Sequence, residues 1–81
     1  MKAIVNVGLK KGVLDDQGKA THHALGTIGF KELVKDVRVG KQIILELDTE
    51  DENLANEQVK KMCEKLLANT VIEDYSIQLI K

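Results

Sequence analysis

Apolar and polar residues alternate in three parts of the chain, over residues 2–10, 37–47 and 75–80. Alternation over four or more residues is typical of a β-strand with one buried face. In the middle stretch Gly40-Lys41 interrupts the alternation, so we expect two short antiparallel strands joined by a tight turn. The three stretches together therefore predict four strands.

Four-residue spacing predicts a first helix between the first strand and the central hairpin. The short carboxylate of Asp15 or Asp16 can accept the free amide protons of its first turn. We expect the helix to run to about residue 28 and to end at Gly29, and we expect Phe30 to fold back onto the core. The apolar positions that carry this pattern are Ala20, Ala24 and Ile28.

A second and clearer helix is predicted from about Glu52 to Ala68. Acidic residues crowd its start and lysines its end, as the helix dipole favours. Asn69 suits a left-handed cap. Leu66 is expected to face the sheet, so its truncation to alanine should be among the most destabilising single changes. The apolar stripe of this helix comprises Ala55, Val59, Met62, Cys63, Leu66 and Leu67.

The predicted order of elements is βαββαβ. This order is typical of a two-layer α+β sandwich of ferredoxin-like type, in which a four-stranded, mostly antiparallel sheet carries two helices on one face. No linker or low-complexity segment divides the chain, so residues 1–81 are expected to form a single domain.

Composition and charge narrow the classes of function. The 81 residues are 43% hydrophobic and 31% charged, which is ordinary for a soluble globular protein, and the net charge of -1 gives no general attraction for nucleic acid or an anionic membrane. No apolar run approaches the roughly 20 residues that span a bilayer, and the N-terminus does not have the pattern of a signal peptide. With a single cysteine, the chain is expected in a reducing cytoplasm.

Histidine and cysteine, two residue types that often carry chemistry, give weak signals here. His22 and His23 are adjacent, so on a helix they point about 100° apart and cannot chelate one metal ion as an i, i+4 pair does. One packed and one exposed histidine is the simpler interpretation. Cys63 falls on the apolar stripe of the second helix, where a buried and inert thiol is expected.

Two further motifs have the composition of ion sites without their spacing. Gly40-Lys41, close to Arg38, could present amides and cations to a phosphate, but it lacks the preceding glycine-rich loop and the following Ser or Thr. The acidic run Asp48–Glu52 lacks the glycine and the terminal glutamate of a calcium loop. A hairpin turn and a solvated helix start explain them better. We therefore predict no catalytic residue, metal site or cofactor site in this chain.

RNA binding is a natural question for a βαββαβ fold, because a common RNA-binding domain has this order and stacks bases on aromatic residues of its sheet. The only aromatic residues here are Phe30 and Tyr75, and the central strands have none. Nucleic-acid binding is not expected.

Small size and patterning instead predict self-association. A domain of this length buries a modest fraction of its surface, and open sheet edges invite pairing with a second copy. The sheet face turned away from the helices carries Ile4, Ile44 and Ile80 among polar neighbours. We expect a homo-oligomer built from dimers, with this face as one candidate interface.

Three groups of residues also have the composition and spacing of a known family. They are Gly12-Val13-Leu14-Asp15 with Gln17-Gly18, then Val37–Lys41, and then Cys63–Asn69 running into Val71–Tyr75. Together they resemble the PurS family, the small subunits of phosphoribosylformylglycinamidine (FGAM) synthase in purine biosynthesis. The resemblance covers nearly the whole chain.

The resemblance implies a non-catalytic subunit of a larger enzyme. In this family a large synthetase subunit carries the ATP-dependent amidation, and a glutaminase subunit releases ammonia from glutamine. The PurS-like subunit forms dimers or dimers of dimers and joins the two, so that formylglycinamide ribonucleotide is converted to formylglycinamidine ribonucleotide. ATP and magnesium are expected on the large subunit. The candidate interface residues are Asp15, Gln17, Gly18, Arg38, Gly40, Lys41, Ile44, Asn69, Asp74 and Tyr75.

Two alternatives remain open at this stage. Ferredoxin-like domains often bind amino acids between paired subunits, so a small-molecule regulatory module is one, with the loop Gly8–Gly18 as its binding segment. A small stand-alone enzyme using His22 or His23 is the other. A melting shift with an amino acid would favour the first, and turnover by the isolated chain the second.

Overall fold

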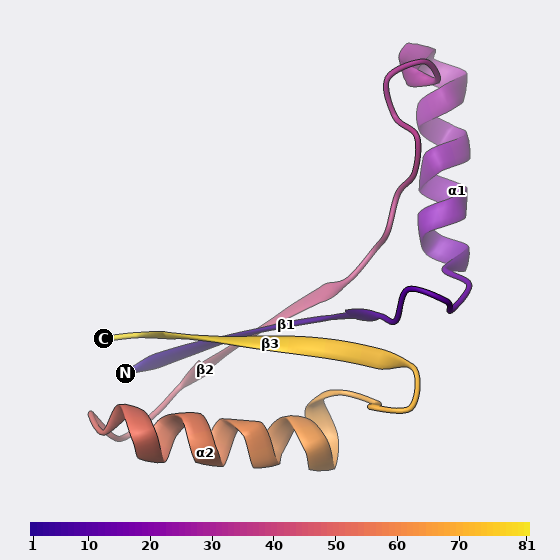
Figure 1. Cartoon of the computed structure of the whole chain (residues 1–81). Helices are drawn as coiled ribbons and strands as arrows, with labels where there is room; N and C mark the ends of the chain where they lie inside the picture. Colours follow the sequence, from indigo (N-terminus) through magenta and orange to yellow (C-terminus); the bar gives the residue numbers. More distant parts are fainter.

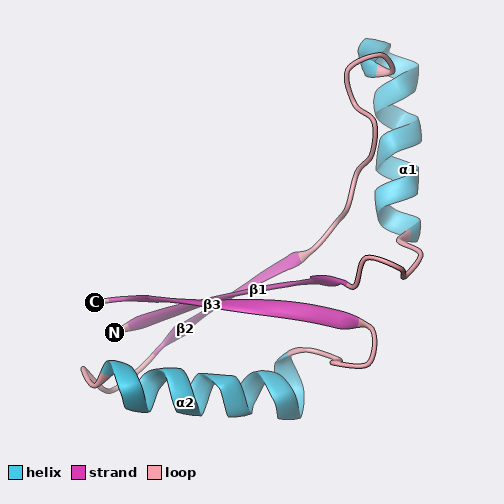
Figure 2. Cartoon of the chain, viewed as in Figure 1, coloured by secondary structure: helices cyan, strands magenta, loops and turns pink.

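Three antiparallel strands and two long helices make up the chain, and the computed structural model describes all 81 residues. The strands and helices follow one another as shown in Figure 1 and are coloured by type in Figure 2. A single wide helical turn, labelled η, continues each helix. The elements are β1 (Lys2–Leu9), α1 (Asp16–Leu25), η1 (Gly26–Phe30), β2 (Lys41–Glu46), α2 (Glu52–Met62), η2 (Cys63–Leu67) and β3 (Glu73–Ile80).

The sheet has β1 in the middle, in the order β2-β1-β3, with both neighbours antiparallel to it. Ile4 of β1 pairs with Ile44 on one side and with Gln78 on the other. An α+β fold with an antiparallel sheet is therefore confirmed, but the prediction of four strands is wrong.

The missing strand is the first half of the expected central hairpin. Val37–Val39 belongs to no strand, and the chain runs through Gly40 into β2 without turning back. A type I′ or II′ hairpin turn would need a positive φ, which Gly40 does not have. The backbone amide of Val39 donates to the carboxylate of Asp15, so a side chain has taken the place of a neighbouring strand.

The two helices do not lie together on one face of the sheet, as the sequence had predicted. Helix α2 covers one face, whereas α1 projects away from the sheet beyond one end of β1 and β2 (Figure 1). The molecule is consequently long and thin, with extents of 48 × 26 × 13 Å. We call residues 16–40, which comprise α1, η1 and the returning segment, the α1 arm.

The core lies between the sheet and α2. Alternation places three small residues of β1 on the face turned to α2, where they meet Val59 and Cys63 of the helix. Only nine of the 81 residues are buried, so most large apolar side chains of the chain are at least partly in water. The buried cluster consists of Ala3, Val5, Val7, Val59, Cys63 and Ala68.

Helix α2 begins as its sequence predicts and ends differently. Asp51 caps it by accepting hydrogen bonds from the amides of Asn53 and Leu54. The wide turn η2 then shifts the register of the last residues, so Leu67 takes the half-buried position and Leu66 is 82% exposed. The prediction that Leu66 faces the sheet, and that its truncation empties the core, is therefore wrong.

The residue after the second helix also differs from expectation. No residue other than glycine has a positive φ, so Asn69 is not a left-handed cap. Ala68 is extended instead, and the Asn69 side chain accepts a hydrogen bond from the amide of Val71. This interaction closes the turn that leads into β3.

The ends of the first helix follow the sequence more closely. Asp15 is its N-cap, and Gly29 has a φ of 106°, a left-handed conformation that suits glycine where the helix ends. Phe30, however, remains 47% exposed, because the arm carries it away from the core. The prediction that Phe30 folds back onto the core is wrong. Neither helix has the length and apolar composition that crossing a membrane requires.

Val59→Ala tests this placement of the core. The Val59 side chain is fully buried between α2 and the sheet, so removing two methyl groups should lower the free energy of unfolding by about 2 kcal/mol. Lys60→Ala, one residue further along and exposed, is the control and should change it by less than about 0.5 kcal/mol. Urea unfolding followed by circular dichroism measures both. Equal stability of the two variants would contradict the described core.

Candidate functional site

The carboxylate of Asp15 joins the two ends of the α1 arm. One oxygen accepts a hydrogen bond from the amide of Gly18 at 2.8 Å, and the other accepts one from the amide of Val39 at 2.7 Å. Gly18 lies in the first turn of α1, whereas Val39 lies just before β2. One buried side chain thus fixes where the arm leaves the sheet and where it returns.

The charge of Asp15 is stabilised by the same contacts. The amide donors of Gly18 and then Val39 hold the pKa of this carboxyl below its ordinary value of 3.8, although desolvation opposes them. The guanidinium of Arg38 adds a smaller effect in the same direction. The group is therefore ionised at neutral pH, as both hydrogen bonds require.

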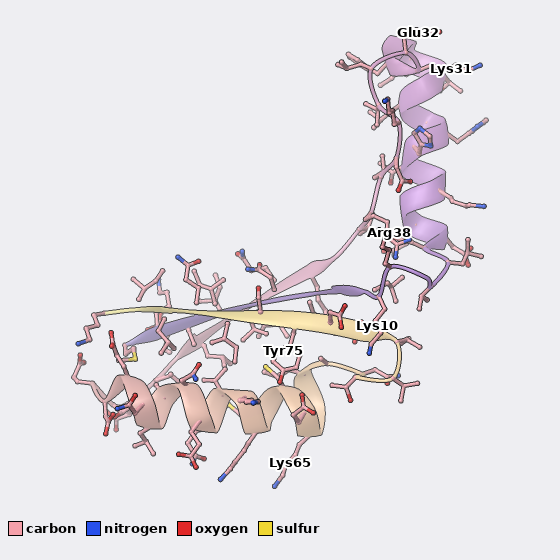
Figure 3. All side chains as sticks on the ribbon, in the orientation of Figure 1. Lys10, Lys31, Glu32, Arg38, Lys65 and Tyr75 are labelled. Carbon is pink, nitrogen blue, oxygen red and sulfur yellow. The ribbon has the colours of Figure 1, made fainter.

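Arg38 ties the returning segment of the arm to the loop after β1. Its guanidinium donates to the carbonyl oxygens of Val13 and Lys10, both at 3.0 Å, and to that of Leu9 at 3.5 Å. Figure 3 shows Arg38 where the arm meets the end of the sheet. A planar group with five donors is suited to holding several carbonyls of one loop at once.

Close backbone contacts make the arm compact along its length. A Cβ atom at Gly18 would lie 2.3 Å from the carbonyl oxygen of Val37, so only glycine allows α1 to approach the returning segment this closely. Further along, Nε2 of His22 is 2.9 Å from the carbonyl oxygen of Val34. The arm therefore consists of a helix that contacts the returning segment at two points.

Gly40 plays a similar part on the sheet side. A Cβ atom there would lie 2.7 Å from the carbonyl oxygen of Val7. The glycine that the sequence assigned to a hairpin turn instead lets the returning chain cross close to β1 before β2 begins. Lys41 follows it as the first residue of β2 and is exposed.

These contacts surround an open hollow of about 380 Å³ at the base of the arm. Of the ten interface residues predicted from the sequence, Asp15, Gln17, Gly40 and Lys41 line it, and Gly18 and Arg38 belong to the contacts just described. The structure therefore brings six of the ten together. The hollow has acidic and basic groups from three segments, among them Asp16, Lys41 and Glu73.

The other four predicted residues lie elsewhere. Asp74 is 3.9 Å from the ammonium of Lys10, and Asn69 closes the turn before β3. The hydroxyl of Tyr75 donates to Glu64 on η2 at 2.6 Å, and this bond raises the pKa of Tyr75 to about 12. Tyr75 thus fastens the end of the second helix to β3 (Figure 3). Ile44 is on the opposite, outer face of the sheet and is 55% exposed.

The residues that often carry chemistry do not form a reactive group. His22 braces the arm, and His23 is exposed with no hydrogen-bond partner in the chain. Cys63 is buried, as predicted, and its burial raises the pKa of the thiol. No three His, Cys, Asp or Glu side chains are close enough together to hold a metal ion.

One surface was not found from the sequence. Leu54, Met62 and Leu66 are exposed along one flank of the second helix, although two of them had been assigned to its buried stripe. Their spacing of eight and four residues was a signal for a shared flank. Nothing in the sequence, however, indicated the wide turn that exposes Leu66.

The fold and the site define a small α+β protein with a braced arm and a thin core. The PurS family model, described as phosphoribosylformylglycinamidine (FGAM) synthase, matches residues 2–81. The chain belongs to the PurS family.

Relatives and solved structures agree with this assignment. The chain is 51% identical over 78 residues to the FGAM synthase subunit PurS of Bacillus subtilis, covering 96% of this chain and 90% of that protein. It is 45% identical over 80 residues to the PurS subunit of Methanocaldococcus jannaschii, covering 99% and 95%. The B. subtilis PurS structure superposes with a TM-score of 0.86 at 50% identity, over 99% of this chain and 98% of that one. A structure of PurLQS from Thermotoga maritima contains a chain that superposes with a TM-score of 0.84 at 35% identity, over 98% and 95%.

Asp15→Asn tests the part that this carboxylate plays. An amide offers one acceptor oxygen to two amide donors, so the variant should melt at a lower temperature than the wild type at pH 7. Because the folded pKa of Asp15 is depressed, its contribution is complete above pH 3.8 and is lost as the pH falls through the lower folded value. The difference in melting temperature should therefore persist down to about pH 4 and shrink below it. A difference independent of pH would contradict a role for the ionised carboxylate.

Proposed function

We propose that the chain is the PurS subunit of FGAM synthase, the enzyme of purine biosynthesis that makes formylglycinamidine ribonucleotide from formylglycinamide ribonucleotide, glutamine and ATP. The family match over residues 2–81 is the observation that carries this proposal. The likeness to a chain of the T. maritima PurLQS structure supports membership of a complex with other subunits.

Within that complex the chain joins subunits and carries out no chemistry of its own. The ATP-dependent amidation belongs to the large synthetase subunit, where ATP and magnesium bind, and the release of ammonia belongs to the glutaminase subunit. Two features support the non-catalytic part of this proposal: Cys63 is buried with a raised pKa, and Asp15 and Arg38 are engaged in holding the arm. The cytoplasm, where purine biosynthesis proceeds, is the expected location.

The base of the arm is the surface that we assign to the larger subunits. It combines a fixed shape with accessible charge, because the Asp15 and Arg38 contacts hold the backbone while Gln17 and Lys41 remain exposed. A surface that is already ordered loses little conformational entropy when a partner binds. This favours the hollow of about 380 Å³ as a docking site for a protein partner.

The chain acts as a homo-oligomer built from dimers. A core of six buried residues leaves little stability for a monomer, and the outer face of the sheet exposes Ile44 and Ile80 beside the half-buried Ile4. These three isoleucines share one face because residues paired across antiparallel strands point to the same side. A second copy that covers this face would remove them from water.

The absence of chemistry in the isolated subunit can be measured directly. The chain alone should release no ammonia from glutamine and consume no ATP, because it has no paired nucleophile and base. Adding the synthetase and glutaminase subunits should give both activities. Turnover by the chain alone that His23→Ala abolishes would contradict the joining role, and a melting shift with free glutamine would favour the regulatory alternative.

Ile44→Lys tests the outer face of the sheet. A lysine there would place an unpaired charge in the interface, so the mass from light scattering at micromolar concentration should fall below that of the wild type. Circular dichroism should be unchanged, because Ile44 does not contact the core. Asn56→Lys, an exposed position on α2 and so away from this face, is the control. An unchanged mass for Ile44→Lys would show that the interface lies on another surface. A wild-type mass of 9.0 kDa would contradict the homo-oligomer.

A further inference from the structure

An open hollow on one side of the α1 arm is lined by basic side chains. Its volume is about 480 Å³, and no carboxylate lines it. A Cβ atom at Gly26 would meet only the side chain of Lys31, at 3.8 Å, so this glycine leaves space within the hollow. Sites for small molecules in proteins commonly have volumes of this order. The lining residues are Lys19, His22, His23, Gly26, Thr27 and Lys31.

Four of these side chains follow one line along the helix. Lys19, His23, Thr27 and Lys31 recur at intervals of four residues, a spacing that places side chains on the same side of a helix, and all four are exposed. The hydroxyl of Thr27 donates its proton to the carbonyl oxygen of Ala24 at 2.7 Å. The two ammonium groups and the imidazole of His23 are therefore the groups of this line that remain available to a ligand.

The cations of the hollow are not balanced by acidic groups of the chain. No Asp or Glu occurs between Asp16 and Glu32 in the sequence. The ion pairs of the structure involve other groups, so neither Lys19 nor Lys31 has a carboxylate oxygen within 4.0 Å of its ammonium. The chain as a whole has a net charge of -1, so this side of the arm has the opposite sign from the molecule.

The contacts within the arm hold the backbone beneath the hollow. Nε2 of His22 is 2.9 Å from the carbonyl oxygen of Val34, and the glycine at position 18 lets the helix lie close to Val37. The helix that presents the two lysines is therefore fixed against the returning segment before any ligand arrives. Binding at an ordered backbone loses less conformational entropy than binding at a segment that must first fold.

The hollow is separate from the surfaces described above. His22, which lines it, and Ala24 are two residues apart, so they point about 200° apart around the helix. It shares no lining residue with the hollow at the base of the arm. Figure 3 shows Lys31 at the tip of the arm, away from the sheet and from α2. A ligand in this hollow would therefore leave the outer face of the sheet and the base of the arm uncovered.

Linked phosphate groups are the ligand chemistry that fits this arrangement. Ammonium groups form charge-assisted hydrogen bonds with phosphate oxygens, and lysine is a common phosphate ligand. Lys19 and Lys31 are 12 residues apart, or about 18 Å along the helix, so a single phosphate group would require both side chains to extend along the helix toward it. A chain of phosphate groups reaches both lysines with less ordering of their side chains.

We propose that this basic hollow binds a chain of linked phosphate groups, with the ammonium groups of Lys19 and Lys31 at its two ends and His23 between them. Inorganic tripolyphosphate and the triphosphate of a nucleotide share this chemistry. The ligand is bound and not transformed, so the site is compatible with a chain that consumes no ATP. The inference does not rest on the proposed function, because it concerns the isolated chain.

Isothermal titration calorimetry with inorganic tripolyphosphate at low salt tests this site. The double variant Lys19→Gln with Lys31→Gln should bind about tenfold more weakly than the wild type, because it loses the contacts at both ends of the ligand. The matched control is Lys60→Gln with Lys65→Gln, which removes two exposed lysines of the second helix segment and changes the net charge equally. The control should bind within about twofold of the wild type. Circular dichroism should be the same for all three proteins, because the four lysines are exposed.

Backbone amide resonances locate the bound probe and distinguish its sources. Tripolyphosphate should shift the resonances of residues 19–31 and leave those of α2 in place. Equal affinity for ATP and tripolyphosphate would show that the phosphate chain alone is recognised, and tighter binding of ATP would show that the nucleoside contributes; both results support the site.

Three results would contradict the proposal. They are no binding of either probe, equal weakening in the two double variants, and shifts confined to residues outside 19–31. If neither probe binds and the Lys19→Gln, Lys31→Gln variant instead loses binding to the synthetase subunit, the hollow is a docking surface for protein and the assignment of a phosphate ligand is wrong.

Discussion

A single carboxylate decides the shape of this chain. Asp15 accepts one hydrogen bond from each end of the α1 arm, so it fixes the start of α1 and the approach to β2 together. A buried charge is costly unless donors surround it, and here the donors are backbone amides that would otherwise have joined a helix start or a strand. The close approaches at Gly18 and Gly40 follow from the same arrangement, because the chain must pass near itself at both ends of the arm.

The position of the arm explains why so little of the chain is buried. With α1 outside the layer, only α2 covers the sheet, and the core depends on small residues such as Ala3 and Cys63. In a chain of this size, each large apolar residue left in water removes stability that a self-contained fold would have. Leu66 and Ile28 are among the large apolar residues that remain exposed in this chain.

Elements set by local pattern could be predicted from the sequence. Alternation and helical spacing identified β1, β2, β3 and both helices, and Asp15 was one of the two residues predicted to cap α1, because a cap acts over three residues. The prediction of a strand at Val37–Val39 was wrong, because alternation does not reveal whether a neighbouring strand exists to pair with it. For the site, the residues at the arm base came from the family resemblance. Their geometry could not be predicted from the sequence, because Arg38 and Asp15 each bond to residues more than twenty positions away in the chain.

The wide turn η2 has a consequence for how such a protein can change. A turn of this kind is equivalent to one residue inserted into a regular helix. Deleting Glu64 or Lys65 would restore the ordinary register with Leu67 still on the side of the sheet, and it would turn Leu66 to the side that faces away from the sheet. The number of residues in this segment, rather than their hydrophobicity, therefore determines on which side of the helix this apolar residue is offered to a neighbour. Inserting or deleting one residue in this segment would be enough to alter the surface that the helix offers to a neighbour, even if no residue were substituted.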